Sequence, residues 1–476
     1  MHPSRRQLHN RQGGSASALF NLVAPLVTSV ATDTRITDTS GQLDLFSQAG
    51  ASGAVSPLIG QEGAALRRGD VDSANDRSTP TSAATPGTRT STTATRTTGT
   101  RTTSCWRARS AGRPGEGFSF GEWVAAWRHC RRTKRNTPAA RAFEDQAEQR
   151  LVELHQALDA GTYTPGPSIC FAITRPKRRE VFAAGFADRV GHHLLYNAIA
   201  ERFERAFIAD SCACIPGRGT LYGARRLETK VRSITQNWSR PAYYLKCDVD
   251  SFFVSIDKRI LERQLVARIP EPHIQDLTLR ILHHDPRVGV VLQDSRRQLE
   301  LVPRRKSLMH QPAHLGLPIG NLSSQFFANV YLDAMDQFVT HRLRVRHYVR
   351  YVDDFILLHE SPQQLNAWRD AIAAFLEEKL ALRLNDGKTI LQPIDRGVDF
   401  VGQVVKPWRT TIRRRTVNAA LERVATAPAE DLPQVANSYF GLFRQASHSA
   451  RDRARLANVV RRKGGAVDHQ LTKAYP

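Results

Sequence analysis

The chain has 476 residues, enough for about three domains of roughly 150 residues each, and 41% of them are hydrophobic, which is ample for a sizeable core. No run of about 18 uncharged apolar residues occurs, so no transmembrane helix is expected. The formal net charge of +23 predicts a polyanionic partner, with nucleic acid as the first candidate and an arginine-rich tail as the alternative. The 6 cysteines include no CxxC pair, which argues against a structural zinc site and indicates a reducing, cytoplasmic compartment.

The first 113 residues differ in composition from the rest of the chain. The first lysine is Lys134, and residues 78–104 consist largely of Ser, Thr, Ala and Pro with isolated Arg. Such a tract has too few apolar side chains to offset the entropy lost on ordering, so we predict that residues 1–113 are disordered or are an extension from a misplaced start codon. Residues 17–31 have the order of a signal peptide, but we favour a chance apolar run because nothing downstream looks secreted.

From about Phe118 onward the chain shows the periodicities of folded structure. Apolar residues at helical spacing predict a helix over residues 119–160, and a β-rich run predicts a strand over residues 169–174. Helical spacing returns over residues 187–209, after which short β-rich runs alternate with helices to about residue 408. This alternation predicts an α+β core. The basic residues 410–462 are expected to be helical.

A pair of adjacent carboxylates lies in the sequence HYVRYVDDFILL, residues 347–358. The flanking segments read as strands, so Asp353 and Asp354 are predicted on the turn of a hairpin. Two neighbouring carboxylates repel each other, which raises a pKa unless a cation is shared, and their hard oxygen atoms suit Mg²⁺. The alternative is a solvated Asp-Asp turn.

A third carboxylate is expected at the end of another strand. In YYLKCDVDSFFVSID, residues 243–257, the strand 243–247 is followed by Asp248, which could complete a three-carboxylate metal site. The alternative for Asp248 is a helix N-cap. For Phe252 and Phe253, which follow, the alternative is packing in the core. We favour that alternative for Phe252.

The segment GLPIGNLSSQFFANVYLDAMD, residues 316–336, combines a turn with a helix. Its glycines and proline predict the turn, and Asn321 could cap the helix that follows. Apolar residues at 322, 326, 330, 334 and 338 predict a stripe facing the core. Ser323, Ser324 and Gln325 lie on the other face.

These three blocks, in this order, resemble motifs A, B and C of the reverse transcriptase palm, with YVDD matching the family's Y-x-D-D box. Four further blocks resemble the fingers, a template-side motif, motif D and the primer grip. They are residues 175–190, 210–220, 382–389 and 397–405. The resemblance implies a right-hand polymerase fold of the α+β class, with fingers, a palm built on an antiparallel sheet, and a helical thumb.

The resemblance also implies a division of the chain into four parts. Residues 1–113 precede the fold, 114–240 form the fingers and N-terminal helices, 241–408 form the palm with a fingers insertion and the primer grip, and 409–476 form a basic helical thumb and tail. The basic residues Arg413, Arg414, Arg415, Arg461, Arg462 and Lys463 are candidates to hold the duplex through its phosphates.

By resemblance, the protein is an RNA-directed DNA polymerase that extends a DNA or RNA primer on an RNA template with dNTPs. Two Mg²⁺ ions, with Mn²⁺ as a substitute, are expected on Asp248, Asp353, Asp354 and the Val249 carbonyl. Lys388 matches the motif D lysine and would assist departure of pyrophosphate. The expected nucleotide-binding residues are Lys177, Arg179, Phe253, Ile319, Gly320 and Gln325.

Motif B carries Ile319 where group II intron and retroviral enzymes have Gln, and this pattern resembles the enzymes of diversity-generating retroelements. That subtype implies error-prone copying and a small basic accessory protein. The alternatives are a defence-associated or other unassigned bacterial reverse transcriptase, a group II intron maturase, which fits less well, and a catalytically silent nucleic-acid-binding scaffold.

Overall fold

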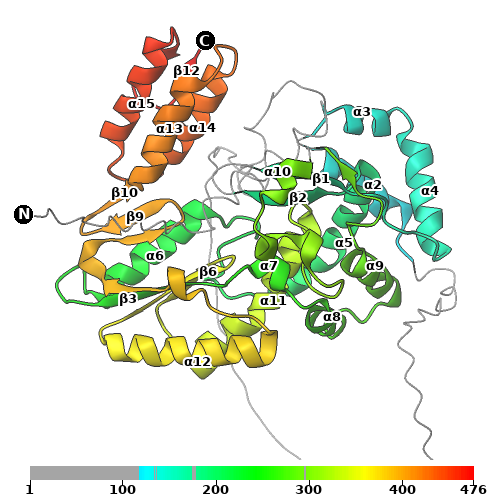
Figure 1. Ribbon diagram of the computed structural model, residues 1–476, viewed down its shortest axis with the longest axis horizontal. Helices are drawn as coiled ribbons and strands as arrows, with labels where there is room; N and C mark the ends of the chain where they lie inside the picture. The colour runs from blue at the N-terminus through cyan, green and yellow to red at the C-terminus, as the bar shows by residue number, and fades with distance from the viewer. Residues whose placement is uncertain (1–116, 133, 136, 174–177, 294–295) are drawn as a thin grey trace, which may run out of the picture. The chain divides into compact units, whose positions relative to one another are not determined.

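The computed structural model describes residues 117–476 apart from 133, 136, 174–177 and 294–295. The predicted disorder of residues 1–113 and the predicted site residue Lys177 therefore lie outside the described residues. Within the described part, helices alternate with mainly antiparallel sheets (Figure 1), which confirms the predicted α+β class. No helix in this part is long and apolar enough to span a membrane.

Three helices occupy residues 119–160, where the apolar spacing predicted a single helix. They are α2 (Phe120–Arg131), α3 (Pro138–Glu144) and α4 (Ala147–Asp159). The chain starts a new helix at Pro138 because a proline is tolerated in the first turn but not in a helix interior. The Thr137 hydroxyl caps that helix by accepting a hydrogen bond from the Ala140 amide at 3.3 Å. Trp123 of α2 is fully buried, and α2 packs along α5 (Phe186–Glu204).

A small sheet precedes α5. Strand β1 (Ile169–Ile173), which the sequence predicted, pairs antiparallel with β2 (Arg179–Ala183) and parallel with β4 (Val291–Leu292). Its two longer strands share a small apolar core, made of Phe171, Ile173, Val181 and Ala183.

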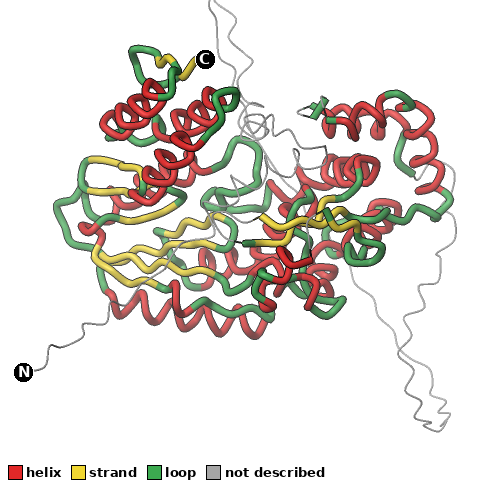
Figure 2. Tube along the Cα trace, turned by 45° about the horizontal axis from the view of Figure 1, so that its top comes forward, coloured by secondary structure: helices red, strands yellow, loops and turns green. Residues whose placement is uncertain are grey.

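The central sheet has four strands in the order β5–β6–β3–β7, all antiparallel, seen in yellow in Figure 2. Its strands are β3 (Tyr243–Asp248), β5 (Tyr348–Tyr351), β6 (Asp354–His359) and β7 (Ile390–Pro393). Strand β5 is buried throughout, and β6 is buried at every position but its last. Both strands are therefore covered on both faces, which explains why they read as nearly continuous apolar runs.

Two helices cover the central sheet. Helix α6 (Thr220–Ile234) contacts β5 and β6, and α12 (Pro362–Leu380) contacts β3 and β6. In the view of Figure 1, α6 lies above the sheet and α12 below it. The edge that carries the three aspartates is thus fixed by a sheet that cannot slip without exposing apolar side chains.

A long helical excursion separates β3 from β5. Its elements are α7 (Phe252–Ser255), α8 (Lys258–Val266), α9 (Pro272–His283), β4, α10 (Arg296–Glu300), the 3₁₀ turns Arg304–Lys306 and Leu308–His310, α11 (Leu322–Gln337) and a π-helical turn (Phe338–Arg342). Helix α11 packs against α5, α8 and α12. The predicted apolar stripe does face the core, and because neighbours surround the helix, Ser323 and Ser324 on the other face are buried as well.

A three-stranded sheet joins the central sheet to the last helices. It is formed by β8 (Val398–Phe400), β9 (Gln403–Lys406) and β10 (Arg409–Ile412) in antiparallel order. The boundary proposed at residue 408 falls between two of its paired strands, so the helical region begins at Arg414 rather than at 410. Helices α13 (Arg414–Thr426), α14 (Leu432–Phe443) and α15 (Ala450–Arg462), with the β11–β12 pair (Ala466–Val467 and Ala474–Tyr475), enclose a second apolar core.

Candidate active site

Three aspartates meet at one end of the central sheet. Asp248 is the last residue of β3 and lies directly opposite Asp354, the first residue of β6. Asp353 belongs to the preceding turn, in which Val352 has a positive φ of 55°. Asp354 therefore lies in a strand, and the prediction that both carboxylates of the pair lie on the turn was wrong for this residue. Cross-strand pairing brings its side chain close to that of Asp248.

Burial and mutual repulsion dominate the electrostatics of this group. Asp354 is 0% exposed and Asp353 is 8% exposed. Burial and, after it, the negative charges of Asp248 and Asp354 together raise the pKa of Asp353 to about 7. Neither carboxylate oxygen of Asp354 accepts a hydrogen bond from the described residues, although the Lys246 ammonium lies 3.4 Å from one of them. Negative charge is therefore concentrated here beyond what the protein itself satisfies.

The nearest cation to Asp248 comes from the 3₁₀ turn Asp386–Lys388, within the segment resembling motif D. The Lys388 ammonium donates a hydrogen bond to Asp248 Oδ1, and the Asn385 side-chain amide lies 3.5 Å from the same oxygen. The Asn385 backbone amide also donates to the Asp248 carbonyl at 2.8 Å. The structure thus brings Lys388 to the site, and adds Asn385, which sequence reasoning did not single out.

The donors at this edge suit a divalent cation. No three His, Cys, Asp or Glu side chains converge into a complete metal cluster among the described residues, and Lys388 occupies one oxygen of Asp248. Even so, Asp354 presents two buried oxygens without hydrogen bonds, beside two further carboxylates. Hard, negatively charged oxygens of this kind fit Mg²⁺. Asp248, Asp353 and Asp354 are the residues that would hold it.

Phe253 lies in α7, shortly after the strand that ends at Asp248. It is almost fully buried, and its ring meets the Phe252 ring edge-on with centroids 5.3 Å apart. Its carbonyl accepts a hydrogen bond from the Leu317 amide at 2.8 Å. Motif A is therefore fixed to the turn that opens motif B, and both phenylalanines belong to the main apolar core.

The motif B turn is attached by its backbone to strand β2. The Phe182 amide donates to the Ile319 carbonyl at 2.9 Å, and the Ile319 side chain packs against the apolar core of β1 and β2. Gly320 has a φ of +133°, and a Cβ there would lie 2.7 Å from the Phe182 carbonyl oxygen, so no other residue fits without displacement. Asn321 occupies the N-cap position, but its side chain accepts from the Ala184 amide at 3.1 Å rather than capping the helix.

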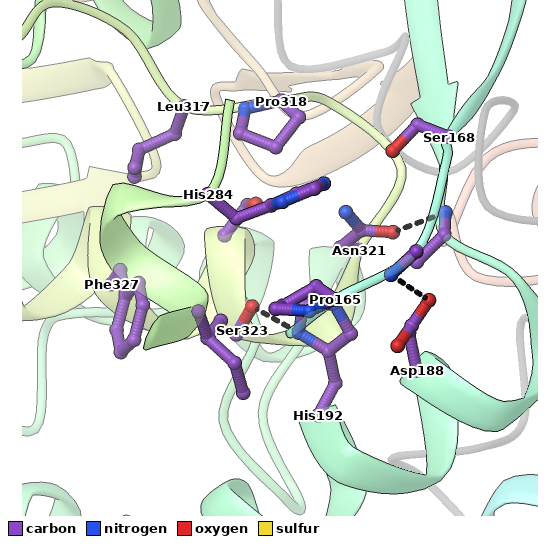
Figure 3. A pocket seen from close by; sticks show the side chains of 14 residues that line it. Pro165, Ser168, Asp188, His192, His284, Leu317, Pro318, Asn321, Ser323 and Phe327 are labelled. Atoms are coloured by element: carbon purple, nitrogen blue, oxygen red, sulfur yellow. Dashed lines mark hydrogen bonds between the residues drawn. The ribbon is translucent and has the colours of Figure 1, made fainter. Parts of the chain in front are cut away.

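A small cavity lined by both apolar and polar side chains lies beneath this turn (Figure 3). Asp188, His192, His284 and Asn321 are among the residues around it, and Ser323 is hydrogen-bonded to His192 Nδ1 at 2.7 Å. Burial lowers the pKa of His192 to about 3, so this ring stays neutral. The cavity has room for about one water molecule, which is far too little for a nucleotide. It is therefore part of the support of motif B rather than a substrate site.

The remaining predicted residues were expected to bind either the nucleotide or the template–primer duplex. Arg179 begins β2, and its charge is close enough to lower the pKa of Asp353 in opposition to burial. Gln325, on α11, accepts a weak hydrogen bond from the Cys214 thiol at 3.5 Å. The predicted duplex-binding residue Arg413 is instead buried, with its guanidinium donating to Asp399 at 2.8 Å. Arg413 is thus paired with Asp399 of the same chain, whereas Arg461 remains exposed.

Sequence reasoning also missed Arg350 and Asp336, which form a fully buried ion pair behind the catalytic turn. The signal was present in the sequence, because an arginine inside a strand that is otherwise aromatic and apolar requires a buried partner. What could not be read was which acid, on which helix, supplies that partner.

Buried carboxylates at the end of adjacent antiparallel strands, held beside a Gly-containing turn and a lysine, define the palm of a template-directed nucleic acid polymerase. Residues 187–405 match the sequence profile of the family described as reverse transcriptase (RNA-dependent DNA polymerase). The match supports RNA-directed DNA polymerase as the enzyme class. The prediction of a right-hand polymerase fold is thereby confirmed.

Several known proteins are similar to the chain. Protein YkfC of Escherichia coli K12 is 23% identical over 327 residues, covering 61% of this chain and 78% of the relative. The group II intron-encoded protein LtrA of Lactococcus lactis subsp. cremoris is 19% identical over 348 residues, covering 58% and 54%, so the chain spans about half of its length. Among solved structures, apo telomerase from Candida tropicalis has a TM-score of 0.41 at 12% identity, covering 63% of this chain and 57% of that one.

Proposed function

We propose that the protein copies an RNA template into cDNA by two-metal nucleotidyl transfer, using Asp248, Asp353 and Asp354 as the metal-holding residues. The observation that carries this proposal is the burial of three carboxylates together at one edge of the palm sheet. Such a group is costly unless cations share its charge. Two bound Mg²⁺ ions, or Mn²⁺ in their place, would activate the primer 3′-hydroxyl and stabilise the leaving pyrophosphate.

The protein's own residues have separate tasks in this proposal. Phe253 presents a rigid aromatic wall to the sugar, which would disfavour the 2′-hydroxyl of ribonucleotides. Arg179 and Lys177 bind the triphosphate, Arg through a bidentate fork and Lys as a point charge. Lys388 neutralises Asp248 in the structure, and once that carboxylate is neutralised otherwise, its ammonium can stabilise or protonate the departing pyrophosphate. The Val249 carbonyl is proposed as a further oxygen ligand.

For the biological role, we propose a diversity-generating retroelement enzyme that copies its template with reduced accuracy. The support is Ile319, whose side chain packs on the fingers core and has no group with which to hydrogen-bond a nucleotide. Loss of one positioning contact of about 1 kcal/mol would lower discrimination several-fold. A small basic accessory protein is a proposed partner. A defence-associated enzyme and a silent nucleic-acid-binding scaffold are the alternatives.

Primer extension on an RNA template with Mg²⁺ and dNTPs tests the proposed activity. Wild-type protein should extend the primer, and Asp353→Asn should not. The conservative exposed change Asp395→Asn serves as the control and should retain activity. Extension by Asp353→Asn at the wild-type rate would refute the assigned role. Sequencing the products of wild type and Ile319→Gln then tests the subtype, since matching error spectra would remove the argument from Ile319.

A further inference from the structure

A basic turn outside all the family motifs lies beside the proposed nucleotide site. The turn (Arg304–Lys306) is a single 3₁₀ turn between α10 and α11. It is held to strand β2 by the buried carboxylate of Glu180, which accepts hydrogen bonds from the Ser307 hydroxyl at 2.5 Å and the Leu308 amide at 2.8 Å. Since Glu180 directly follows Arg179, this anchor places the basic turn next to the start of β2.

A second anchor ties the basic turn to motif A. The Arg305 guanidinium lies 3.0 Å from Asp250 Oδ1, and Asp250 follows the metal-holding Asp248 by two residues. The Asn385 side-chain amide also donates to Asp250, at 3.3 Å. The basic turn is therefore held between strand β2 and the end of the central sheet that carries Asp248.

The charge around Lys306 is unusually crowded. Lys306 is half-buried, and its pKa is lowered by that burial and then by the positive charges of Arg305, Lys388 and Arg179, with Asp250 opposing them. Cationic side chains on an ordinary solvated surface spread apart, because like charges repel. Cations gathered beside a catalytic centre are stabilised when a polyanion lies among them.

We propose that Lys306 binds the triphosphate of the incoming nucleotide, with Arg305 holding the basic turn in position on Asp250. The inference rests on the proposed polymerase function. It adds to that site a residue from the helical segment between β3 and β5. Arg304, in the same turn, is exposed and lies outside the site. The phosphodiester backbone of the template–primer duplex offers the same chemistry, so the experiment must separate the two sources of phosphate.

The experiment compares Lys306→Gln with Arg304→Gln, which removes the same charge two residues away in the same turn. Each full-length protein is titrated with inorganic tripolyphosphate in a calorimeter without nucleic acid, and with a labelled RNA–DNA duplex by fluorescence anisotropy. One charge-assisted phosphate contact is worth about tenfold or more in affinity. We expect Lys306→Gln to bind tripolyphosphate about tenfold more weakly, with duplex affinity unchanged, and Arg304→Gln to stay within about twofold of wild type in both.

Equal affinities of Lys306→Gln and wild type for tripolyphosphate would overturn the proposal. Equal losses in the two variants would overturn it as well, because they would show a diffuse charge effect. A loss confined to the duplex would assign Lys306 to the nucleic acid backbone. Primer extension completes the set: a raised KM for dNTP with kcat retained in Lys306→Gln supports the inference. Absence of extension by wild type would refute the polymerase function while leaving the tripolyphosphate comparison readable.

Discussion

Arg350 and Asp336 form a two-point ion pair from which solvent is fully excluded, with N–O distances of 2.5 and 2.8 Å. Arg350 lies on β5 and Asp336 on α11. The same guanidinium donates to the Val352 carbonyl at 2.9 Å and to the Ser211 hydroxyl at 2.9 Å. Val352 is a β-branched residue at positive φ, a strained conformation that needs outside support. The pair therefore holds the turn that carries Asp353.

Variants of Arg350 should distinguish the contribution of this ion pair to stability from its contribution to positioning the turn that carries Asp353. Arg350→Met alone leaves Asp336 buried and uncompensated, and should lower the free energy of unfolding by about 3–5 kcal/mol. The triple variant Arg350→Met/Asp336→Leu/Tyr348→Phe also removes the carboxylate and the hydroxyl that donates to it at 2.7 Å. It should recover most of that stability in urea denaturation, yet keep a strongly reduced kcat because the Val352 carbonyl has lost its donor. A triple variant with wild-type kcat would contradict the positioning role.

Asp353 should make the metal-free protein less stable as pH rises. Its folded-state pKa of about 7 exceeds the ordinary value of 3.8. Below pH 3.8 the carboxyl is protonated in both states and has no effect; between pH 3.8 and 7 the unfolded chain ionises first, so stability falls, and above pH 7 the penalty is complete. Asp353→Asn should therefore be more stable than wild type at pH 8, by on the order of 2–4 kcal/mol, and equal to it near pH 4.

Saturating Mg²⁺ should shrink this difference at pH 8, because binding stabilises the folded wild-type protein. Thermal unfolding with and without Mg²⁺ measures both effects, and the exposed change Asp395→Asn controls for loss of a charge elsewhere. A pH-independent gap between Asp353→Asn and wild type would show that the folded site does not resist ionisation of this carboxyl.

Gly320→Ala should weaken the attachment of the motif B turn to strand β2. The new methyl group would meet the Phe182 carbonyl oxygen at 2.7 Å, on top of the cost of positive φ. The matched control is Gly464→Ala, where φ is +85° and nothing lies within 4 Å of the added Cβ. The control should lose about 1 kcal/mol of stability and Gly320→Ala clearly more, with a fall in primer extension. Similar losses of unfolding free energy in urea titrations of the two variants would mean that the backbone near Phe182 moves aside without lowering stability.

Phe253→Val should relax the choice between deoxyribonucleotides and ribonucleotides. A shorter side chain opens space where the 2′-hydroxyl would lie, and we expect the ratio of kcat/KM for dNTP over rNTP to fall at least tenfold, or about 1.4 kcal/mol. Phe252→Leu perturbs the adjacent core position and should leave this ratio unchanged. Unaltered selectivity in Phe253→Val would remove Phe253 from the sugar site.

The sequence predicted which aspartates lie at the ends of the central strands better than it predicted the residues that support them. The strands ending at Asp248 and beginning near Asp354 were predictable, because their apolar runs and the motif order are local properties. The contact of Lys388 with Asp248, and the use of Asn321 to bind the fingers strand instead of its own helix, were not. These partners are chosen by tertiary packing between segments more than 100 residues apart, which no periodicity encodes.

The contact between the Phe182 amide and the Ile319 carbonyl involves main-chain atoms alone. A main-chain hydrogen bond is indifferent to the side chain of either residue, so position 319 can change chemically while the loop keeps its place. Natural variation or directed evolution can therefore exchange this one side chain without rebuilding the palm. If the role proposed for Ile319 holds, residue 319 is a position at which the accuracy of copying can change while the catalytic residues stay in place.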